Sequence, residues 1–418
     1  MIEEICKQLL AFKNTQGDFP QKNLTIALQP LVLLTLLKAQ TDIYPAIYWQ
    51  DKELQQSIVC LGAIDDKQAI PSVTGEARYY GGIAFQQQGE QWSGFPAIRF
   101  IRPALEFINE NNSLTLTCHF DGNFSIENTL ALVKKLQLPV PLLVTNSTLL
   151  SRNDIPCKQH WAELVDLCIE YKALLPKVVL SRQTELICDK AIDHCDLLYQ
   201  WQKANPASFH FSFQFNKTDV FIGCSPERLF SRTHQTLYTE ALAGTVNRGR
   251  NEREDNILLQ SLLSDKKIDR ENYLVQEFII ANLKGLKAQV QCDQPHVMQL
   301  HNVQHLCVPI KAALSQQTKD AELLYKLHPT PAVGGTPKLP ALQFINDNEP
   351  YCRGWYAGAV GYISQHKSDF SVAIRSALIS NNKVKLFAGA GIVTGSIAEQ
   401  EWQELDNKIY TALELITQ

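Results

Sequence analysis

Strand patterns with a period of two residues dominate the second half of the chain, and they constrain its fold most strongly. FHFSFQF (209–215) carries phenylalanine at every second position, NKTD follows as a turn, and VFIGCSPERLF (220–230) is expected to return as the second strand of a hairpin. GWYAGAVGYIS, DFSVAIRSALIS and KVKLFAGAGIV (354–393) predict further consecutive antiparallel strands. Helical patterns lie between these groups, at 161–176, 195–205, 252–284 and from Ile397 onward. Hairpins separated by helices indicate an α+β fold rather than alternating βαβ units.

The composition excludes several classes of function. A net charge of -4 without a basic run does not suit a protein that binds a nucleic-acid backbone. The early apolar run 26–37 is much shorter than the roughly 20 residues of a membrane span, so we expect it in the core. The acidic start MIEEICKQLL lacks the basic region of a signal peptide. The 11 cysteines form no CxxC pair, which predicts free thiols and a cytoplasmic protein.

Lys177 is the most unusual residue of the strand patterns. It stands between Pro176 and the apolar run Val178–Leu180. Lysine is almost never fully buried without a partner. The residue is therefore either a surface lysine at the first position of a strand, or a base whose proton affinity the protein has lowered.

Two further motifs have weak functional interpretations. GAGIVTG (389–395) is not the dinucleotide fingerprint and lies in no βαβ unit, but its small residues let backbone N–H groups approach an anion. His301 and His305 form HxxxH without the glutamate of zinc peptidases, in an extended context. We therefore expect hydrogen-bonded histidines near a site rather than zinc ligands.

Four carboxylates from separated segments are candidate metal ligands. Glu227 lies in SPER and Glu271 in DRENYLV, while Glu401 and Glu404 share one helix face in EWQE. Mg²⁺ prefers oxygen ligands and takes one or two carboxylates together with substrate oxygens. Taken singly, each of these residues would be interpreted as a solvated surface charge.

Many motifs in order resemble the chorismate-utilising enzymes. They are SPERLF, TEALAGT, DRENYLV, HPTPAVGG, RGWYAGAVGYIS, FSVAIRSALI, AGAGIVTGS and EWQELDNK. The resemblance is strong over about 155–415 and weaker near the N-terminus. It implies one α+β domain over 1–418, with two packed antiparallel sheets surrounded by helices as in the anthranilate synthase large subunit. Within it, 1–155 would be the variable N-terminal part and 156–418 the catalytic part.

Within this family the chain is most similar to the isochorismate synthases of the menaquinone pathway. Aminodeoxychorismate synthases typically carry a nucleophilic lysine where this chain has Ala243, and anthranilate synthases typically carry glutamine where it has Lys177. The resemblance therefore implies an isomerase that adds water to chorismate, without a glutaminase subunit, as a monomer or homodimer. Salicylate synthase, which eliminates pyruvate from isochorismate in the same cleft, is the alternative, and a siderophore pathway is also open.

The resemblance assigns roles to particular residues. Lys177 would be the general base at ring carbon 2 and Glu227 the general acid at the C4 hydroxyl. Because burial disfavours both charged forms, we expect a lowered pKa for the lysine and a raised pKa for the glutamate. Mg²⁺ would bind Glu271 and Glu404, with Glu401 as a second ligand or a holder of water. The expected substrate contacts are Gly244, Thr245, Tyr356, Arg375, Gly389, Gly391 and Lys408.

For two more residues we expect a location but assign no chemical role. His328 in HPTP is expected near the site. Phe387 stands where tyrosine is common in the family, and we expect it to face the core.

Overall fold

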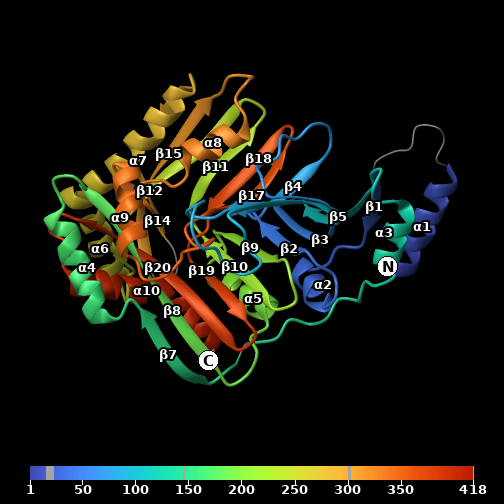
Figure 1. The fold of residues 1–418 in the computed structure, drawn as a ribbon, viewed down its shortest axis with the longest axis horizontal. Coiled ribbons are helices and arrows are strands. Elements are labelled where there is room, and N and C mark those ends of the chain that lie inside the picture. Colours follow the sequence, from blue (N-terminus) through green and yellow to red (C-terminus); the bar gives the residue numbers. More distant parts are fainter. Residues whose placement is uncertain (16–22, 145, 300–302, 418) are drawn as a thin grey trace.

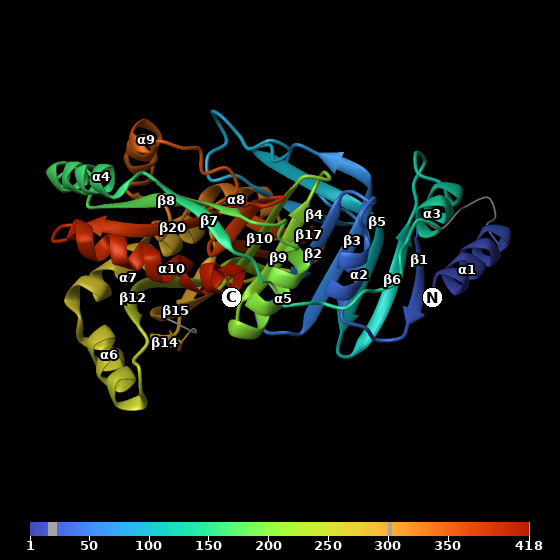
Figure 2. The ribbon, with the colours of Figure 1, turned by 90° about the horizontal axis from the view of Figure 1, so that it is seen from below.

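The computed structural model describes residues 1–15, 23–144, 146–299 and 303–417. Ten helices lie in these ranges: α1 (Ile2–Thr15), α2 (Leu33–Ala39), α3 (Ile126–Val133), α4 (Lys158–Glu170), α5 (His194–Ala204), α6 (Glu252–Ser264), α7 (Lys266–Gly285), α8 (Asp320–Leu327), α9 (Lys338–Asn348) and α10 (Ala398–Thr417). In both views α1 and α3 lie at one end of the molecule and α6 and α7 toward the other (Figures 1 and 2).

The same ranges contain twenty strands. They are β1 (Asn23–Leu28), β2 (Ala46–Gln50), β3 (Gln56–Lys67), β4 (Arg78–Ile83), β5 (Ile98–Glu110), β6 (Ser113–His119), β7 (Leu149–Ile155), β8 (Lys177–Cys188), β9 (Phe209–Gln214), β10 (Asp219–Ser225), β11 (Arg228–Thr233), β12 (Thr236–Asn247), β13 (Gln289–Cys292), β14 (His296–Gln299), β15 (Val303–Ala313), β16 (Gly335–Thr336), β17 (Ala359–Ser364), β18 (Lys367–Val372), β19 (Ser376–Ser380) and β20 (Lys383–Val393).

Hydrogen bonds join these strands into one antiparallel network with two arms. The first arm runs β7–β8–β20–β19–β10–β9–β2–β3, and the second runs β4–β17–β18–β11–β12–β15. Strand β5 connects them, because it pairs with β3 along one edge and with β4 and β6 along the other. Helices α4 and α10 pack on β20, and α6 and α7 pack on β12. The predicted α+β fold is confirmed, with the two expected sheets present as arms of a single network.

Two chain segments cross between the arms at the same level. The chain passes from β10 to β11 at Pro226–Glu227 and from β18 to β19 at Ala373–Arg375, while β10 pairs with β19 and β11 with β18. Proline has no N–H to donate to a ladder, which favours a break at this point. The prediction of one continuous strand over 220–230 is therefore wrong, and the single strand expected over 369–380 is also divided.

The N-terminal part is not a separate layer. Strand β2 pairs with β9, and β4 pairs with β17, so strands from before residue 155 lie inside both arms. One large cluster of buried apolar side chains extends from Ile5 to Ile416. All 11 cysteines are free thiols, as expected. In the described ranges, none of the helices has the length and apolar character needed to cross a membrane.

Candidate active site

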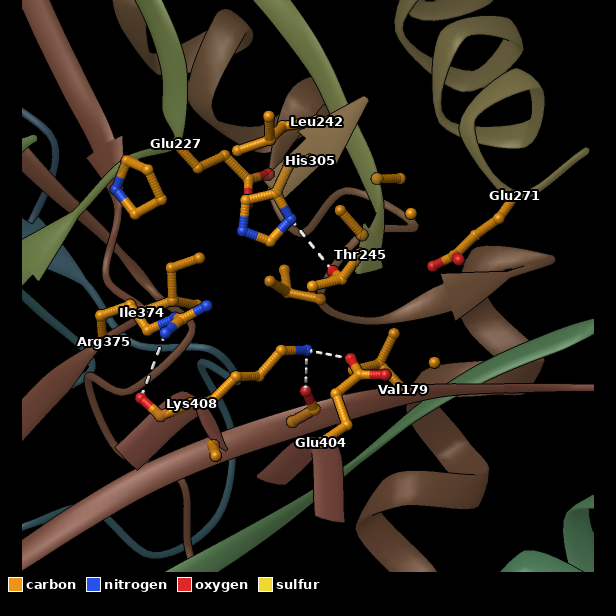
Figure 3. Close-up of a pocket in the computed structure, with 18 of the residues that line it drawn as sticks. Val179, Glu227, Leu242, Thr245, Glu271, His305, Ile374, Arg375, Glu404 and Lys408 are labelled. Atoms are coloured by element: carbon orange, nitrogen blue, oxygen red, sulfur yellow. Dashed lines mark hydrogen bonds and ion pairs between the residues drawn. The ribbon is translucent and has the colours of Figure 1, made fainter. Parts of the chain in front are cut away.

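A cavity of about 290 Å³ lies between the two arms, where both strand crossings occur. Strands β12 and β15 with α7 line one side, and β8 and β20 with α10 line the other (Figure 3). Eleven of the predicted site residues line it: Glu227, Gly244, Thr245, Glu271, Tyr356, Arg375, Gly389, Gly391, Glu401, Glu404 and Lys408. The twelfth, Lys177, lies directly behind Gly391. The fold thus brings together residues that are separated by up to 231 positions.

Glu227 occupies the break between β10 and β11. Its carbonyl accepts a hydrogen bond from the backbone N–H of Val372 (3.1 Å), and its own N–H donates to the hydroxyl of Ser225 (3.3 Å). The residue is 4% exposed, and its carboxyl faces the cavity (Figure 3). Burial is the main cause that raises the pKa of Glu227, to about 8, and the negative charge of Glu240 is the second. Nearby lysines act in the opposite direction. The carboxyl is therefore largely protonated at neutral pH.

Lys177 begins β8, with its side chain fully buried. Its ammonium lies 2.9 Å from Oε1 of Glu271, which reaches it from α7 on the opposite arm. A Cβ added to Gly391 would lie 3.1 Å from Cε of Lys177 and 3.1 Å from Oε1 of Glu271. The absence of a side chain at Gly391 therefore leaves room for this ion pair at the cavity wall.

A β-bulge shapes the opposite wall. The pairing of β12 with β15 shifts register between Ala243 and Thr245, and Gly244 adopts a φ of +84°. Glycine is the residue that populates this region without steric cost. After the bulge, the hydroxyl of Thr245 lies 3.0 Å from Nδ1 of His305. Burial, together with nearby cations, lowers the pKa of His305 to about 3, so this ring is neutral.

Asn272 fixes helix α7 against the bulge. Its buried side-chain amide donates to the carbonyls of Ala241 (3.0 Å), Ala243 (3.2 Å) and Leu306 (3.0 Å). These contacts satisfy backbone oxygens that the irregular ladder leaves available. Since Glu271 is the preceding residue, Asn272 also determines where that carboxylate enters the cavity.

Cations line the side of the cavity formed by α10 and the second crossing. Arg375 has a φ of +49°, which is uncommon for a residue other than glycine and directs its side chain to the cavity. Its guanidinium donates to the carbonyl of Lys408 (3.2 Å). The Lys408 ammonium contacts the carbonyl of Gly389 (2.7 Å) and the carboxylate of Glu404 (2.5 Å). This wall therefore offers two cationic groups to an anionic ligand, one of which, Lys408, is paired with Glu404.

An aromatic stack supports the tyrosine of the site. The ring of Phe387 lies between Tyr356 (centroids 5.0 Å apart) and Trp92 (5.2 Å), nearly parallel to both. Phe387 is 1% exposed, as expected for a core residue, but it also lines the cavity. Burial raises the pKa of Tyr356, so its hydroxyl keeps its proton and can donate a hydrogen bond to a ligand.

Two expectations about histidines have different outcomes. His328 is buried against the ring of Phe85 and is not among the residues that line the cavity, so it lies beside the site rather than in it. His305 lines the cavity with a hydrogen-bonded ring, whereas His301 lies outside the described residues.

Comparisons with known proteins agree with this geometry. A family profile described as "Chorismate binding enzyme" matches residues 62–417. The chain belongs to this family. It is 35% identical to isochorismate synthase MenF of Escherichia coli K12, with 88% of this chain and 87% of that protein covered. It is 32% identical to MenF of Haemophilus influenzae, with 92% and 89% covered. A solved structure of the E. coli menaquinone-specific enzyme matches with a TM-score of 0.89 and 33% identity, over 100% of this chain and 99% of that one.

The acidic residues of this chorismate-binding enzyme suit a magnesium ion. Glu271, Glu401 and Glu404 offer oxygen donors to one cavity, although their three carboxylates do not all lie within 4.8 Å of one another. Glu271 pairs with Lys177, and Glu404 pairs with Lys408. Magnesium takes one or two carboxylates and fills its remaining positions with water or substrate oxygens. The donor set therefore fits an ion that is completed by the substrate.

Sequence reasoning missed several residues around the site. Asn272 and Glu240 lie inside the quoted motifs DRENYLV and TEALAGT, but the pattern of those strings does not show which way either side chain points. Lys52 stands more than 170 positions before Glu227, and only the fold brings its ammonium to the carbonyl of Pro226 (3.4 Å).

Proposed function

We propose that this protein is an isochorismate synthase. It would convert chorismate reversibly to isochorismate, adding water at C2 and expelling the C4 hydroxyl. The observation that carries this proposal is a buried carboxyl, Glu227, with a pKa of about 8 in a cavity lined by Arg375 and Lys408. The named relatives support the choice of reaction within the family.

Glu227 serves as the general acid in this proposal. Hydroxide is a poor leaving group, so the C4 hydroxyl has to receive a proton as its bond to carbon breaks. A carboxyl that keeps its proton at neutral pH can supply it.

Lys177 serves as the general base for the incoming water. It belongs to the first arm, whereas Glu227 lies at the crossing into the second, so the two groups can act on different ring carbons. Lys177 must first lose its own proton, and its partner Glu271 is also an expected magnesium ligand. Metal binding and the charge on Lys177 are therefore expected to be coupled.

The charges of the substrate fit the remaining residues. Chorismate carries two carboxylates, and Arg375 can hold the one on the enolpyruvyl group with a bidentate pair. Tyr356 and the backbone near Gly389 and Gly391 can donate further hydrogen bonds. When bound to Glu271 and Glu404, with Glu401 nearby, Mg²⁺ would neutralise the carboxylate on C1, which Lys408 also approaches.

We place the reaction in menaquinone biosynthesis, in the cytoplasm. The solved relative with a full-length match is described as menaquinone-specific, which supports the pathway. Eleven free thiols suit a reducing compartment.

Product analysis tests the proposal. The purified protein is incubated with chorismate and Mg²⁺, and the products are separated and identified by NMR. We expect isochorismate in equilibrium with chorismate, loss of turnover in EDTA, and recovery on adding Mg²⁺. Fluorescent salicylate with pyruvate would instead identify a salicylate synthase, and full activity in EDTA would remove the metal from the mechanism.

Two variants test the assigned roles. Lys177→Met keeps most of the buried stem, and Glu227→Gln keeps the shape of the acid. Both should still bind chorismate, measured by calorimetry, while turnover falls by about 10²- to 10⁴-fold. Normal turnover in either variant would remove that residue from its role.

A further inference from the structure

The turn between β2 and β3 reaches from the N-terminal part into the segment that carries Glu227. Its residue Lys52 lies 2.6 Å from both carboxylate oxygens of Glu240 on β12. The Lys52 ammonium also lies 3.4 Å from the carbonyl of Pro226. Glu240 in turn accepts a hydrogen bond from the backbone N–H of Arg228 (2.8 Å). The ion pair thus contacts the residues on either side of Glu227.

The turn itself is held in a fixed shape. One carboxylate oxygen of Asp51 accepts the backbone N–H of Gln55 (2.8 Å) and, more distantly, that of Gln56 (3.4 Å). The next residue after Lys52, Glu53, binds the guanidinium of Arg228 through both oxygens (2.8 and 2.7 Å). Two adjacent residues of one turn therefore hold the segment 226–228 at two points.

Burial distinguishes the two contacts. The side chains of Lys52 and Glu240 are 11% and 10% exposed, whereas that of Glu53 is 41% exposed. Water screens the outer pair, but it screens the inner pair much less. A change of charge at Lys52 or Glu240 should therefore shift the pKa of Glu227, while the same change at Glu53 should shift it only weakly.

We propose that the Lys52–Glu240 pair is a positioning element for Glu227, which holds the segment 226–228 and balances the charge around the acid. This inference rests on the proposed function for its catalytic meaning. It gives the N-terminal part of the chain a role in positioning the proposed acid. After burial, the charge of Glu240 contributes most to the raised pKa of Glu227. The charge of Lys52 is one of the lysine charges that lower this pKa.

Other charged or titratable groups also surround Glu227 and stay unchanged in the test. They come from β8, α10, β15, β11 and the second crossing: Lys177, Lys408, His305, Cys307, Arg228 and Arg375. Because the two members of the pair have opposite charges, removing one or the other should act on Glu227 in opposite directions. A purely structural role would not reverse its sign in this way.

Infrared titration of the substrate-free protein measures directly how the protonation of the Glu227 carboxyl changes with pH. Each background is compared with the same background carrying Glu227→Gln, so that the carboxyl band of this residue is isolated. Lys52→Met leaves the negative charge of Glu240, and the titration should move to higher pH by about one unit. Glu240→Gln leaves the positive charge of Lys52, and the titration should move to lower pH. The double variant should titrate close to the wild type, and so should the matched control Glu53→Gln.

The pH profile of kcat/KM for isochorismate formation, which reports the pKa values of the substrate-free enzyme, is measured on the same proteins. Its alkaline limb should move with the infrared titration, and the double variant should still lose turnover because the segment is no longer held. Shifts of the same sign in both single variants, or a shift in neither, would overturn the proposal. If the wild type forms no isochorismate, the proposed function fails, while the infrared titration still decides the effect of the pair on Glu227.

Discussion

Gly391→Ala is a small change that tests the geometry of the proposed base. The new Cβ would lie 3.1 Å from Cε of Lys177 and 3.1 Å from Oε1 of Glu271. Carbon atoms pack best at about 3.5–4.0 Å, so the ion pair has to move by roughly 0.4 Å or more. A misplacement of about 1 Å in an active site can cost 10²-fold in rate. We therefore expect kcat to fall about tenfold, with little change in stability because alanine suits a strand at least as well as glycine.

The assay is steady-state formation of isochorismate, with thermal unfolding measured in parallel. Gly122→Ala is the matched control, since a Cβ there meets nothing within 4 Å. The magnesium concentration for half-maximal activity should rise only in Gly391→Ala, because Glu271 is displaced. If kcat and the magnesium requirement both match those of the control, the argument that Lys177 and Glu271 act from this position is refuted.

Three further predictions follow from the same site. Because the pKa of Glu227 in the substrate-free protein is about 8, its carboxyl should be about 90% protonated at pH 7 and about 10% at pH 9. We therefore expect kcat/KM to fall about tenfold per pH unit above pH 8, and an alkaline limb starting near pH 5 would contradict this. Gly244→Ala places a Cβ 2.4 Å from Ile268 at a φ of +84° and should lower the free energy of unfolding by about 1–3 kcal/mol in urea titration, whereas an unchanged midpoint would show that the bulge tolerates a side chain. Arg375→Lys keeps the charge but loses the bidentate fork, so KM for chorismate should rise at least about tenfold, and an unchanged KM would mean that Arg375 does not hold a substrate carboxylate.

The sequence predicts the elements of this protein better than their connections. Alternation of polar and apolar residues indicates the strands 209–215 and 383–393 correctly. It does not show that 220–230 and 369–380 are each divided between two arms, because both halves of each segment carry apolar residues that suit a strand. Pro226 is the one local signal for the first break, and no comparable residue marks the second. Both breaks place candidate site residues, Glu227 and Arg375, at the cavity, so the alternation pattern fails where the candidate site begins.

The candidate site itself could be predicted largely from the resemblance to a family. Motif by motif, that resemblance identified the residues that the fold gathers around one cavity. It gave no information about contacts between motifs, such as the ion pair of Lys177 with Glu271 or that of Lys52 with Glu240. Such contacts depend on which way side chains point in three dimensions, and they are the features that adjust the charge of the proposed acid and base.

Isotope transfer from solvent tests the central claim most directly. The protein converts chorismate in H₂¹⁸O with Mg²⁺ present, and the isochorismate formed early in the reaction is analysed by mass spectrometry and ¹³C NMR. Addition of water at C2 with loss of the C4 hydroxyl predicts one ¹⁸O atom, located on C2. An unlabelled product, in which the original hydroxyl has migrated within the ring, would contradict the roles proposed for Lys177 and Glu227.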